Sequence, residues 1–348
     1  MFIRSLINES VVAMKAIVPV MLVMSFFALI SCNRNKFEKD ISDIDLEIDI
    51  KRFEKDIFTL DFDSIDQKLP YLRDKYGAFF EIYNRNIIHI GKSTGEQYPE
   101  DLMAFITDFT VNQAYKNVSE QYEEMTDIKR GLQKAFKYYK YYFPDKMVPA
   151  IYTYVSGFNQ SIVVTDSVLA IGLDKYLGQE SDVYKNLMVK KYLRKTMERK
   201  YIVPDCMKAW ALTEWVFNDS INNVINNMIY HGKILYFKKA MMPEVSDSIL
   251  IGFSPREMEW CKQQEQMMWK YLIDNDLLFE RDYMVINKLV NPAPYTGYFS
   301  QQSPGRAAVW IGWQIVKQYM NRNDDKSLKQ LMENNHYEEI LREAKYKP

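Results

Sequence analysis

The chain has 348 residues, 47% of them hydrophobic and 26% charged, a composition that fits a globular protein and excludes a disordered one. It contains 45 lysine and arginine residues against 46 aspartate and glutamate residues, with no long basic block. This balance argues against nucleic-acid binding, which requires a basic surface.

The N-terminal segment has the pattern of a bacterial lipoprotein signal. Sixteen uncharged residues lie between Lys15 and Cys32, fewer than the roughly 20 that a membrane-spanning helix needs. They end in LISC, where the aliphatic and small residues before Cys32 fit a lipobox. We predict that residues 1–31 are removed and that Cys32 is acylated; an ordinary signal peptide followed by an incidental cysteine is the alternative. The cation at the start of the apolar run makes Met14 a second candidate for the first residue.

The segment after the signal is predicted to be a short tether followed by one large body. Residues 32–43 are polar and charged, whereas residues 44–348 show regular apolar patterns without a Pro-rich or Gly/Ser-rich linker. Two acyl chains would anchor this body stably. We therefore expect a lipid-anchored protein of the cell envelope that faces the periplasm.

The first part of this body is predicted to contain one strand and three helices. Apolar and acidic residues alternate over residues 44–50, which is the period of a half-buried strand. Apolar spacings of three and four then predict a helix over residues 64–86 and a second helix from Tyr98 with Phe109 on its inner face. Residues 119–142 are predicted to form the third helix.

Three short runs rich in β-branched and aromatic residues predict a small sheet in the middle of the chain. They cover residues 148–155, 161–165 and 168–173, and the brief segments between them suggest two or three hairpin-connected strands. Helical patterns continue from there almost to the C-terminus. The predicted fold class is therefore α+β, a mostly helical single domain around a small sheet.

The C-terminal half carries two predicted helix starts and a groove of small residues. SPRE at residues 254–257 is a capping box with proline at the first helical position, and Ser303–Pro304 is expected to open a later helix in the same way. On that helix, Gly305, Ala308 and Gly312 are spaced at three and four and form a face of small residues. A neighbouring backbone can approach this face closely. Trp310 and Trp313 would fill the space beside it, so a packing role is favoured over partner docking.

Several reactive or aromatic side chains are predicted to be structural. Cys206 and Cys261 are expected to be buried free thiols, with a single disulfide as the alternative. Tyr138, Tyr141 and Tyr142 share one face of the third predicted helix, which favours core packing over a stacking surface for bases or sugars. Neither group therefore indicates a catalytic site.

The stretch ALTEWVF has the spacing of a zinc-peptidase helix without its ligands. An HExxH motif places two histidines one turn apart, but Thr213 and Phe217 occupy those positions and only Glu214 matches. The three histidines of the chain lie beyond helical reach of one another, so no metal site is predicted. Glu214 is either a carboxylate paired with a basic residue or a general acid/base in a cleft. His231 is either a satisfied side chain near a helix junction or a ligand or proton-transfer group.

Several long stretches together resemble one family. DIDLEIDIKRFEKDIF, MIYHGKILYFKKAMMP, SPREMEWC, NPAPYTGYF and SPGRAAVWIGWQIV follow the lipobox in the order seen in the gliding-motility lipoprotein GldB family of Bacteroidota. This family is distantly similar to predicted zinc-dependent peptidases, in which VLAIGLDKYLG would be a strand and KAWALTEWVF the active-site helix. The resemblance implies an envelope lipoprotein linked with gliding machinery and a zincin-like core, that of a degenerate metallopeptidase.

The sequence as a whole predicts a non-catalytic scaffold or binding lipoprotein. It would act with partner proteins of the envelope and without a cofactor, a metal or an identified small-molecule substrate. The alternative is a divergent metal-dependent hydrolase or peptidase that uses Glu214 and His231. That alternative requires the two side chains to meet in one cleft.

Overall fold

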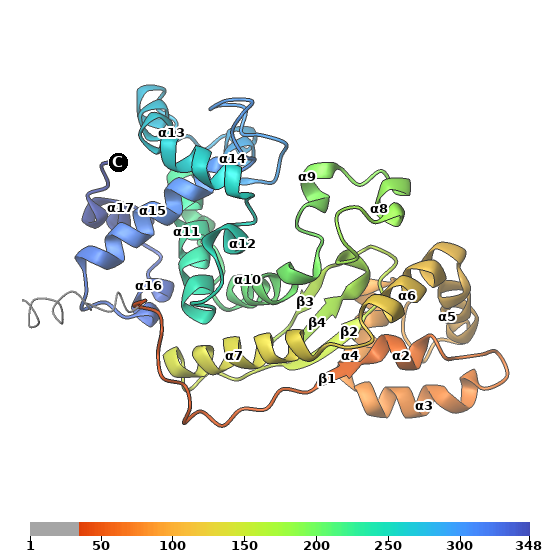
Figure 1. Ribbon diagram of the computed structural model, residues 1–348. Helices are drawn as coiled ribbons and strands as arrows, with labels where there is room; N and C mark the ends of the chain where they lie inside the picture. Colours follow the sequence, from red (N-terminus) through yellow and green to blue (C-terminus); the bar gives the residue numbers. More distant parts are fainter. Residues whose placement is uncertain (1–34) are drawn as a thin grey trace, which may run out of the picture. The chain divides into compact units, whose positions relative to one another are not determined.

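The computed structural model describes residues 35–348; the predicted signal peptide and Cys32 lie outside the described residues. Residues from Lys39 to Pro348 form one compact unit, to which the following description refers. Helices dominate this unit, and a single small mixed sheet accompanies them in the described part of the chain (Figure 1). The predicted α+β class is therefore confirmed, whereas a zincin-like core is not shown.

The sheet has four strands in the order β1-β2-β4-β3. Strands β1 and β2 are parallel, β2 and β4 are parallel, and β3 and β4 form an antiparallel pair. The predicted hairpin connection thus holds for β3 and β4. A hairpin between β2 and β3 is absent from the sheet, because β4 pairs with β2. Every residue of β4 is buried. The strands span Ile50–Arg52 (β1), Ala150–Tyr154 (β2), Ile162–Val164 (β3) and Val168–Gly172 (β4).

The alternating pattern predicts a strand over residues 44–50, but the observed strand β1 begins only at Ile50. Only Ile50 of that range belongs to β1. The apolar residues before it are still less exposed than the acidic residues between them. The alternation therefore predicts which side chains are covered, but it does not predict backbone pairing.

The helices before β2 are shorter and more numerous than predicted. Gly77, with φ 50°, divides the segment predicted as one helix over residues 64–86. Phe109 is 83% exposed and begins a new helix instead of facing the core. The elements are α2 (Phe53–Ile57), α3 (Ile65–Tyr76), α4 (Ala78–Ile82), the π-helical η1 (Tyr83–Ile87), α5 (Tyr98–Thr107), α6 (Phe109–Gln121) and α7 (Thr126–Tyr142).

Helix α11 is the central element of the C-terminal half. It is buried on almost every side, and helices α15, α17, α10, α14 and α7 contact it (Figure 1). Helix α10 also contacts β3, β4 and α7, so it connects the sheet with the helices around α11. The helices after the sheet are α8 (Asp182–Asn186), α9 (Lys191–Arg194), α10 (Ile202–Glu214), α11 (Val224–Met241), α12 (Asp247–Ile251), α13 (Pro255–Asp274), α14 (Tyr283–Val290), α15 (Ala307–Arg322), α16 (Leu328–Glu333) and α17 (Tyr337–Ala344).

One of the two predicted helix starts is confirmed and the other is wrong. Ser254 and Glu257 form the capping box of α13. Helix α15 begins at Ala307 instead of at Ser303–Pro304, because the Ser303 hydroxyl is used within the preceding turn, where it donates to the Ser300 carbonyl oxygen at 2.6 Å. The first backbone N–H of α15, that of Ala307, instead donates to Thr296 Oγ1 at 2.8 Å, eleven residues earlier in the chain.

The remaining structural predictions have mixed outcomes. Cys206 and Cys261 are buried free thiols, as predicted. Tyr138 is buried as predicted. Tyr139 is also buried, whereas Tyr141 is exposed, so the prediction that Tyr138 and Tyr141 share a buried face is wrong. Trp310 and Trp313 pack edge to face with ring centroids 6.2 Å apart, and both are buried. Packing is therefore the role of both tryptophans.

Candidate functional site

The ALTEWVF segment does not form one continuous helix. Helix α10 ends at Glu214, and Phe217 lies beyond it, stacked on the Tyr337 ring with centroids 5.6 Å apart. Thr213 is exposed, and its hydroxyl donates to the Ala209 carbonyl oxygen. The positions of an HExxH motif therefore do not share a helix face, and the expected active-site helix is wrong at its C-terminal end.

Glu214 is held in an ion pair at the end of α10. Its carboxylate, 18% exposed, accepts a hydrogen bond from the Lys146 ammonium, which is 46% exposed. Lys146 lies in the segment between α7 and β2. The structure thus places Glu214 with a basic partner near the surface.

His231 lies elsewhere, on α11, and has different neighbours. Burial, together with the positive charges of Lys208 and Arg306, lowers the pKa of His231 to about 3. The imidazole is therefore neutral at physiological pH. Within residues 35–348, no hydrogen bond joins His231 to Glu214, and no cluster of three or more His, Cys, Asp or Glu side chains has the arrangement of a metal site.

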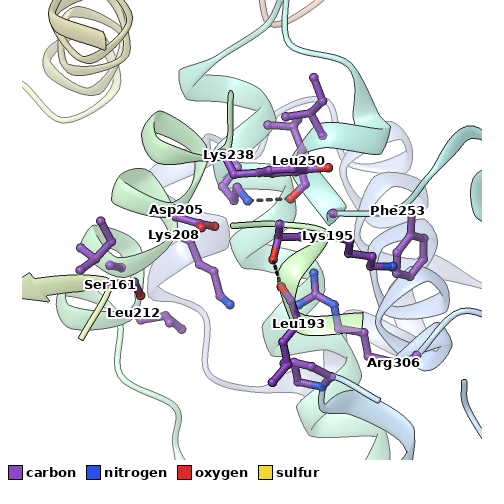
Figure 2. Close-up of a pocket in the computed structure, with 18 of the residues that line it drawn as sticks. Ser161, Leu193, Lys195, Asp205, Lys208, Leu212, Lys238, Leu250, Phe253 and Arg306 are labelled. Carbon is purple, nitrogen blue, oxygen red and sulfur yellow. Dashed lines mark hydrogen bonds between the residues drawn. The ribbon is translucent and has the colours of Figure 1, made fainter. Parts of the chain in front are cut away.

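The cations beside His231 belong to a cavity of about 290 Å³ that the sequence did not reveal. Helices α10, α11 and α12, the segment around α9 and the turn before α15 supply its walls (Figure 2). Four basic side chains line it, whereas Asp205 is the sole carboxylate among its described lining residues. We call this space the cationic cavity; its basic residues are Lys195, Lys208, Lys238 and Arg306.

Helix α10 contributes one complete face to the cationic cavity. Lys208 and Ala209 lie three and four residues after Asp205, and Leu212 lies four and three residues after them, so all four line the same side. Asp205 accepts a hydrogen bond from the Tyr176 hydroxyl at 3.1 Å. Lys208 forms no hydrogen bond or ion pair with any described residue, and burial lowers its pKa, as does the nearby Arg306. Its amino group is therefore available to a ligand.

Lys238 and Arg306 approach the cavity from two other elements. Lys238 on α11 is 3% exposed and donates to the Leu250 carbonyl oxygen at 2.6 Å. Burial lowers the pKa of Lys238 to about 7. Arg306 donates to the Ile251 carbonyl oxygen from one guanidinium nitrogen. Both cations thus use the last carbonyl groups of α12, where the partial negative charge of a helix end favours them.

The backbone at Arg306 is in an unusual conformation. Its φ of 56° lies in the left-handed region, which non-glycine residues rarely adopt. The preceding Gly305 permits a close turn, because a Cβ there would lie 2.0 Å from the Ala293 carbonyl oxygen. Thr296 closes the same turn by donating to the Pro304 carbonyl oxygen at 2.8 Å. The loop thereby fixes where the Arg306 side chain leaves the backbone.

Figure 2 shows the Lys208 amino group and the Arg306 guanidinium directed into the same space. The charged part of the cavity is bordered by apolar groups from Leu193, Leu212 and Phe253. Such a combination of cations and apolar walls is suited to an organic anion.

Sequence reasoning missed this cavity because its charged residues lie on separate segments. Lys208 is three residues after Asp205, a helical spacing that identifies a shared face but no chemistry. Arg306 follows a Pro-Gly pair, and the Ser303–Pro304 pattern at this place predicts a helix start. The available signal was the unusual SPGR turn, which predicts a constrained arginine without indicating its partners.

Comparison with known proteins identifies one family. The family described as "Gliding motility protein GldB" matches residues 34–348, which confirms the resemblance noted in the sequence. No curated protein and no solved structure matches the chain.

Proposed function

Because the chain belongs to the GldB family of gliding motility proteins, we propose that it is a lipid-anchored scaffold or binding protein of gliding-type machinery in the cell envelope. The family match over residues 34–348 is the observation that carries this proposal. The protein would act with partner proteins on the periplasmic side of a membrane. Its contribution would be binding, without a chemical reaction.

The proposed anchor is a diacylated Cys32. The lipobox sequence LISC supports it. Across residues 35–348, the structure contains no helix with the length and apolarity required to span a membrane. Two acyl chains give stable membrane attachment where a single chain is marginal.

The environments of the two acid/base candidates support a non-catalytic role. Glu214 is bound to Lys146, and His231 is held neutral beside two cations. A general acid and base must both reach the reacting groups of one substrate. Glu214 and His231 have separate sets of neighbours, so neither is placed to assist the other.

The experiment is complementation of a gliding strain that lacks its own family member. Cys32→Ala should abolish labelling by a fatty-acid probe, release the protein from the membrane fraction and prevent restoration of spreading. Glu214→Gln and His231→Gln, made together, should restore spreading as well as the unchanged chain does. Normal membrane attachment of Cys32→Ala would refute the anchor. Loss of spreading by a stably expressed Glu214→Gln/His231→Gln protein would refute the non-catalytic role.

A further inference from the structure

We propose that the cationic cavity binds the phosphate group of a small organic phosphate, with Lys208 and Arg306 as the principal contacts. This inference goes beyond the motility role and does not depend on the lipid anchor. It rests on the charge balance, geometry and shape of the cavity.

The charges that line the cavity do not balance. Lys195 is paired with Glu257 at 2.8 Å, so this cation is compensated. Among the described lining residues, Asp205 is the one carboxylate beside the remaining cations, Lys208, Lys238 and Arg306; the negative charge of Glu257 also acts on Arg306. The cavity therefore has an excess of positive charge, and an anion would neutralise it.

Folding accounts for only part of this cluster of cations, because Lys238 and Arg306 bond carbonyl oxygens of α12 whereas Lys208 has no such partner among the described residues. Burial lowers the pKa of Lys208, Lys238 and Arg306, which means that each loses solvation in its charged form. An incompletely compensated buried charge destabilises a fold. Arg306 adds a backbone conformation of the kind that is often found at ligand sites. A ligand that supplies negative charge would offset both costs.

The donor arrangement favours phosphate over carboxylate. Lys208, Lys238 and Arg306 come from α10, α11 and the turn before α15, so they approach a ligand from different directions. A phosphate monoester offers three terminal oxygens and nearly two negative charges at neutral pH. A carboxylate has two oxygens in one plane and a single charge, and the Arg306 fork alone could satisfy it.

The size of the cavity indicates that the phosphate carries an organic group. A water molecule occupies about 30 Å³ in the liquid, and a phosphate group is only a few times larger. A cavity of about 290 Å³ therefore leaves space for a substituent. Leu193, Leu212 and Phe253 provide apolar walls for it (Figure 2).

The test uses the full-length lipoprotein in a neutral detergent, with phenyl phosphate as the probe. Isothermal titration calorimetry should show binding of phenyl phosphate that is tighter than binding of inorganic phosphate or benzoate. Lys208→Met should weaken phenyl phosphate binding by about tenfold or more, because it removes a charge-assisted hydrogen bond. Lys270→Met is the matched control: Lys270 lies on α13, is 72% exposed and pairs with Asp274, so its loss should leave binding unchanged.

Thermal unfolding separates a binding role of Lys208 from a structural role. Without ligand, Lys208→Met should be at least as stable as the unchanged protein, because it removes an unpaired, poorly solvated cation. Arg306→Lys is the second variant; it keeps the charge but loses the planar fork, and it should bind phenyl phosphate several-fold more weakly. No saturable binding of phenyl phosphate by the unchanged protein, or equal binding by the unchanged protein and both variants, would overturn the proposal.

Two further measurements are needed. One distinguishes a lipid headgroup from a soluble phosphate ester, and the other tests the cavity proposal separately from the anchor proposal. Short-chain phosphatidic acid should displace phenyl phosphate if the ligand is a lipid headgroup. If the ligand is a soluble phosphomonoester, phenyl phosphate should stay bound in the presence of phosphatidic acid. The Cys32→Ala protein should bind phenyl phosphate with unchanged affinity. Loss of membrane attachment with intact binding would therefore leave this inference standing, and failure of binding with intact attachment would overturn it alone.

Discussion

Gly232 and Gly312 bring helices α11 and α15 into direct backbone contact. A Cβ on Gly232 would lie 2.4 Å from the Gly312 carbonyl oxygen, and a Cβ on Gly312 would lie 1.8 Å from the Met228 carbonyl oxygen. Neither separation is compatible with a side chain. The close approach holds the two most extensively packed helices of the C-terminal half together, and with them the positions of Lys238 and Arg306.

Gly312→Ala should therefore destabilise the protein strongly. The added methyl group would meet backbone atoms that cannot move independently, so we expect a loss of about 3 kcal/mol or more. Gly297→Ala is the control, because its Cβ would find its nearest neighbour 3.9 Å away. That change should alter the unfolding free energy by less than about 0.5 kcal/mol. Urea unfolding of the two variants tests the difference, and equal stability would disprove the close contact.

Thr296 should contribute both to stability and to the cationic cavity. Its buried hydroxyl accepts a hydrogen bond from the Ala307 N–H and donates one to the Pro304 carbonyl oxygen. Thr296→Val keeps the shape but leaves the Ala307 N–H unpaired and removes one of the two hydrogen bonds to the Pro304 carbonyl oxygen, so we expect a loss of about 1–3 kcal/mol. Phenyl phosphate binding should also weaken, because the turn no longer holds Arg306 firmly.

Thr213→Val provides the matched control for this change. The Thr213 hydroxyl is exposed and donates to a carbonyl oxygen within its own helix. Its removal should leave both stability and binding nearly unchanged. If Thr296→Val behaved like Thr213→Val in calorimetry, the long-range cap would have no role in shaping the cavity.

The Lys146–Glu214 ion pair should contribute little to stability. Lys146 is nearly half exposed, so solvent and salt screen the interaction. A double-mutant cycle with Glu214→Gln and Lys146→Met should give a coupling energy of about 1 kcal/mol or less. The coupling should decrease in high salt. A large, salt-independent coupling would instead indicate an enclosed charge pair.

The sequence predicts local features of this fold better than its long-range features. The three β-branched runs identify the positions of β2, β3 and β4, because strand propensity and turn residues act over short distances. They do not reveal that β4 pairs with β2, since this parallel pairing depends on contacts between separate segments. Similarly, Gly77 interrupts a continuous helical pattern because the chain there adopts a positive φ, which periodicity does not detect.

The candidate site shows the same limit. The spacing in ALTEWVF identifies Glu214 as a candidate, but the helix ends at that residue and its partner Lys146 is 68 positions away. Lys208 and Arg306 meet because α10 and the turn before α15 are both placed around α11. No local motif encodes that meeting. An excess of cations over acidic neighbours becomes visible only when the three-dimensional arrangement is known.

Asp174 should give the folded protein a distinctive dependence on pH. The side chain is fully buried, and its carboxylate accepts hydrogen bonds from the Ser156 N–H at 3.1 Å and the Phe158 N–H at 2.7 Å. It thereby holds a turn in which Gly157 and Phe158 both have positive φ. Burial raises the pKa of Asp174 from 3.8 to about 6, although these hydrogen bonds oppose the increase.

The sign of the effect follows from the raised pKa. Between about pH 4 and 6, the folded state keeps a proton on Asp174 that the unfolded state has released, so this group's contribution to stability decreases as pH rises and becomes constant above pH 6. The full change is at most about 3 kcal/mol. Asp174→Asn removes this titration and replaces one acceptor oxygen by a donor, so it should destabilise the protein by about 1–3 kcal/mol.

Urea unfolding at several pH values between 4 and 7 isolates the contribution of Asp174. Other carboxylates, such as Asp127 and Glu257, have lowered pKa values and make the unchanged protein more stable as pH rises. These groups are present in both proteins, so their effects cancel in the difference between the unchanged chain and Asp174→Asn. The stability advantage of the unchanged chain should therefore be larger at pH 4.5 than at pH 7. A constant advantage would show that the buried carboxyl does not titrate in this range, and an advantage that grows toward pH 7 would show that its pKa is not raised.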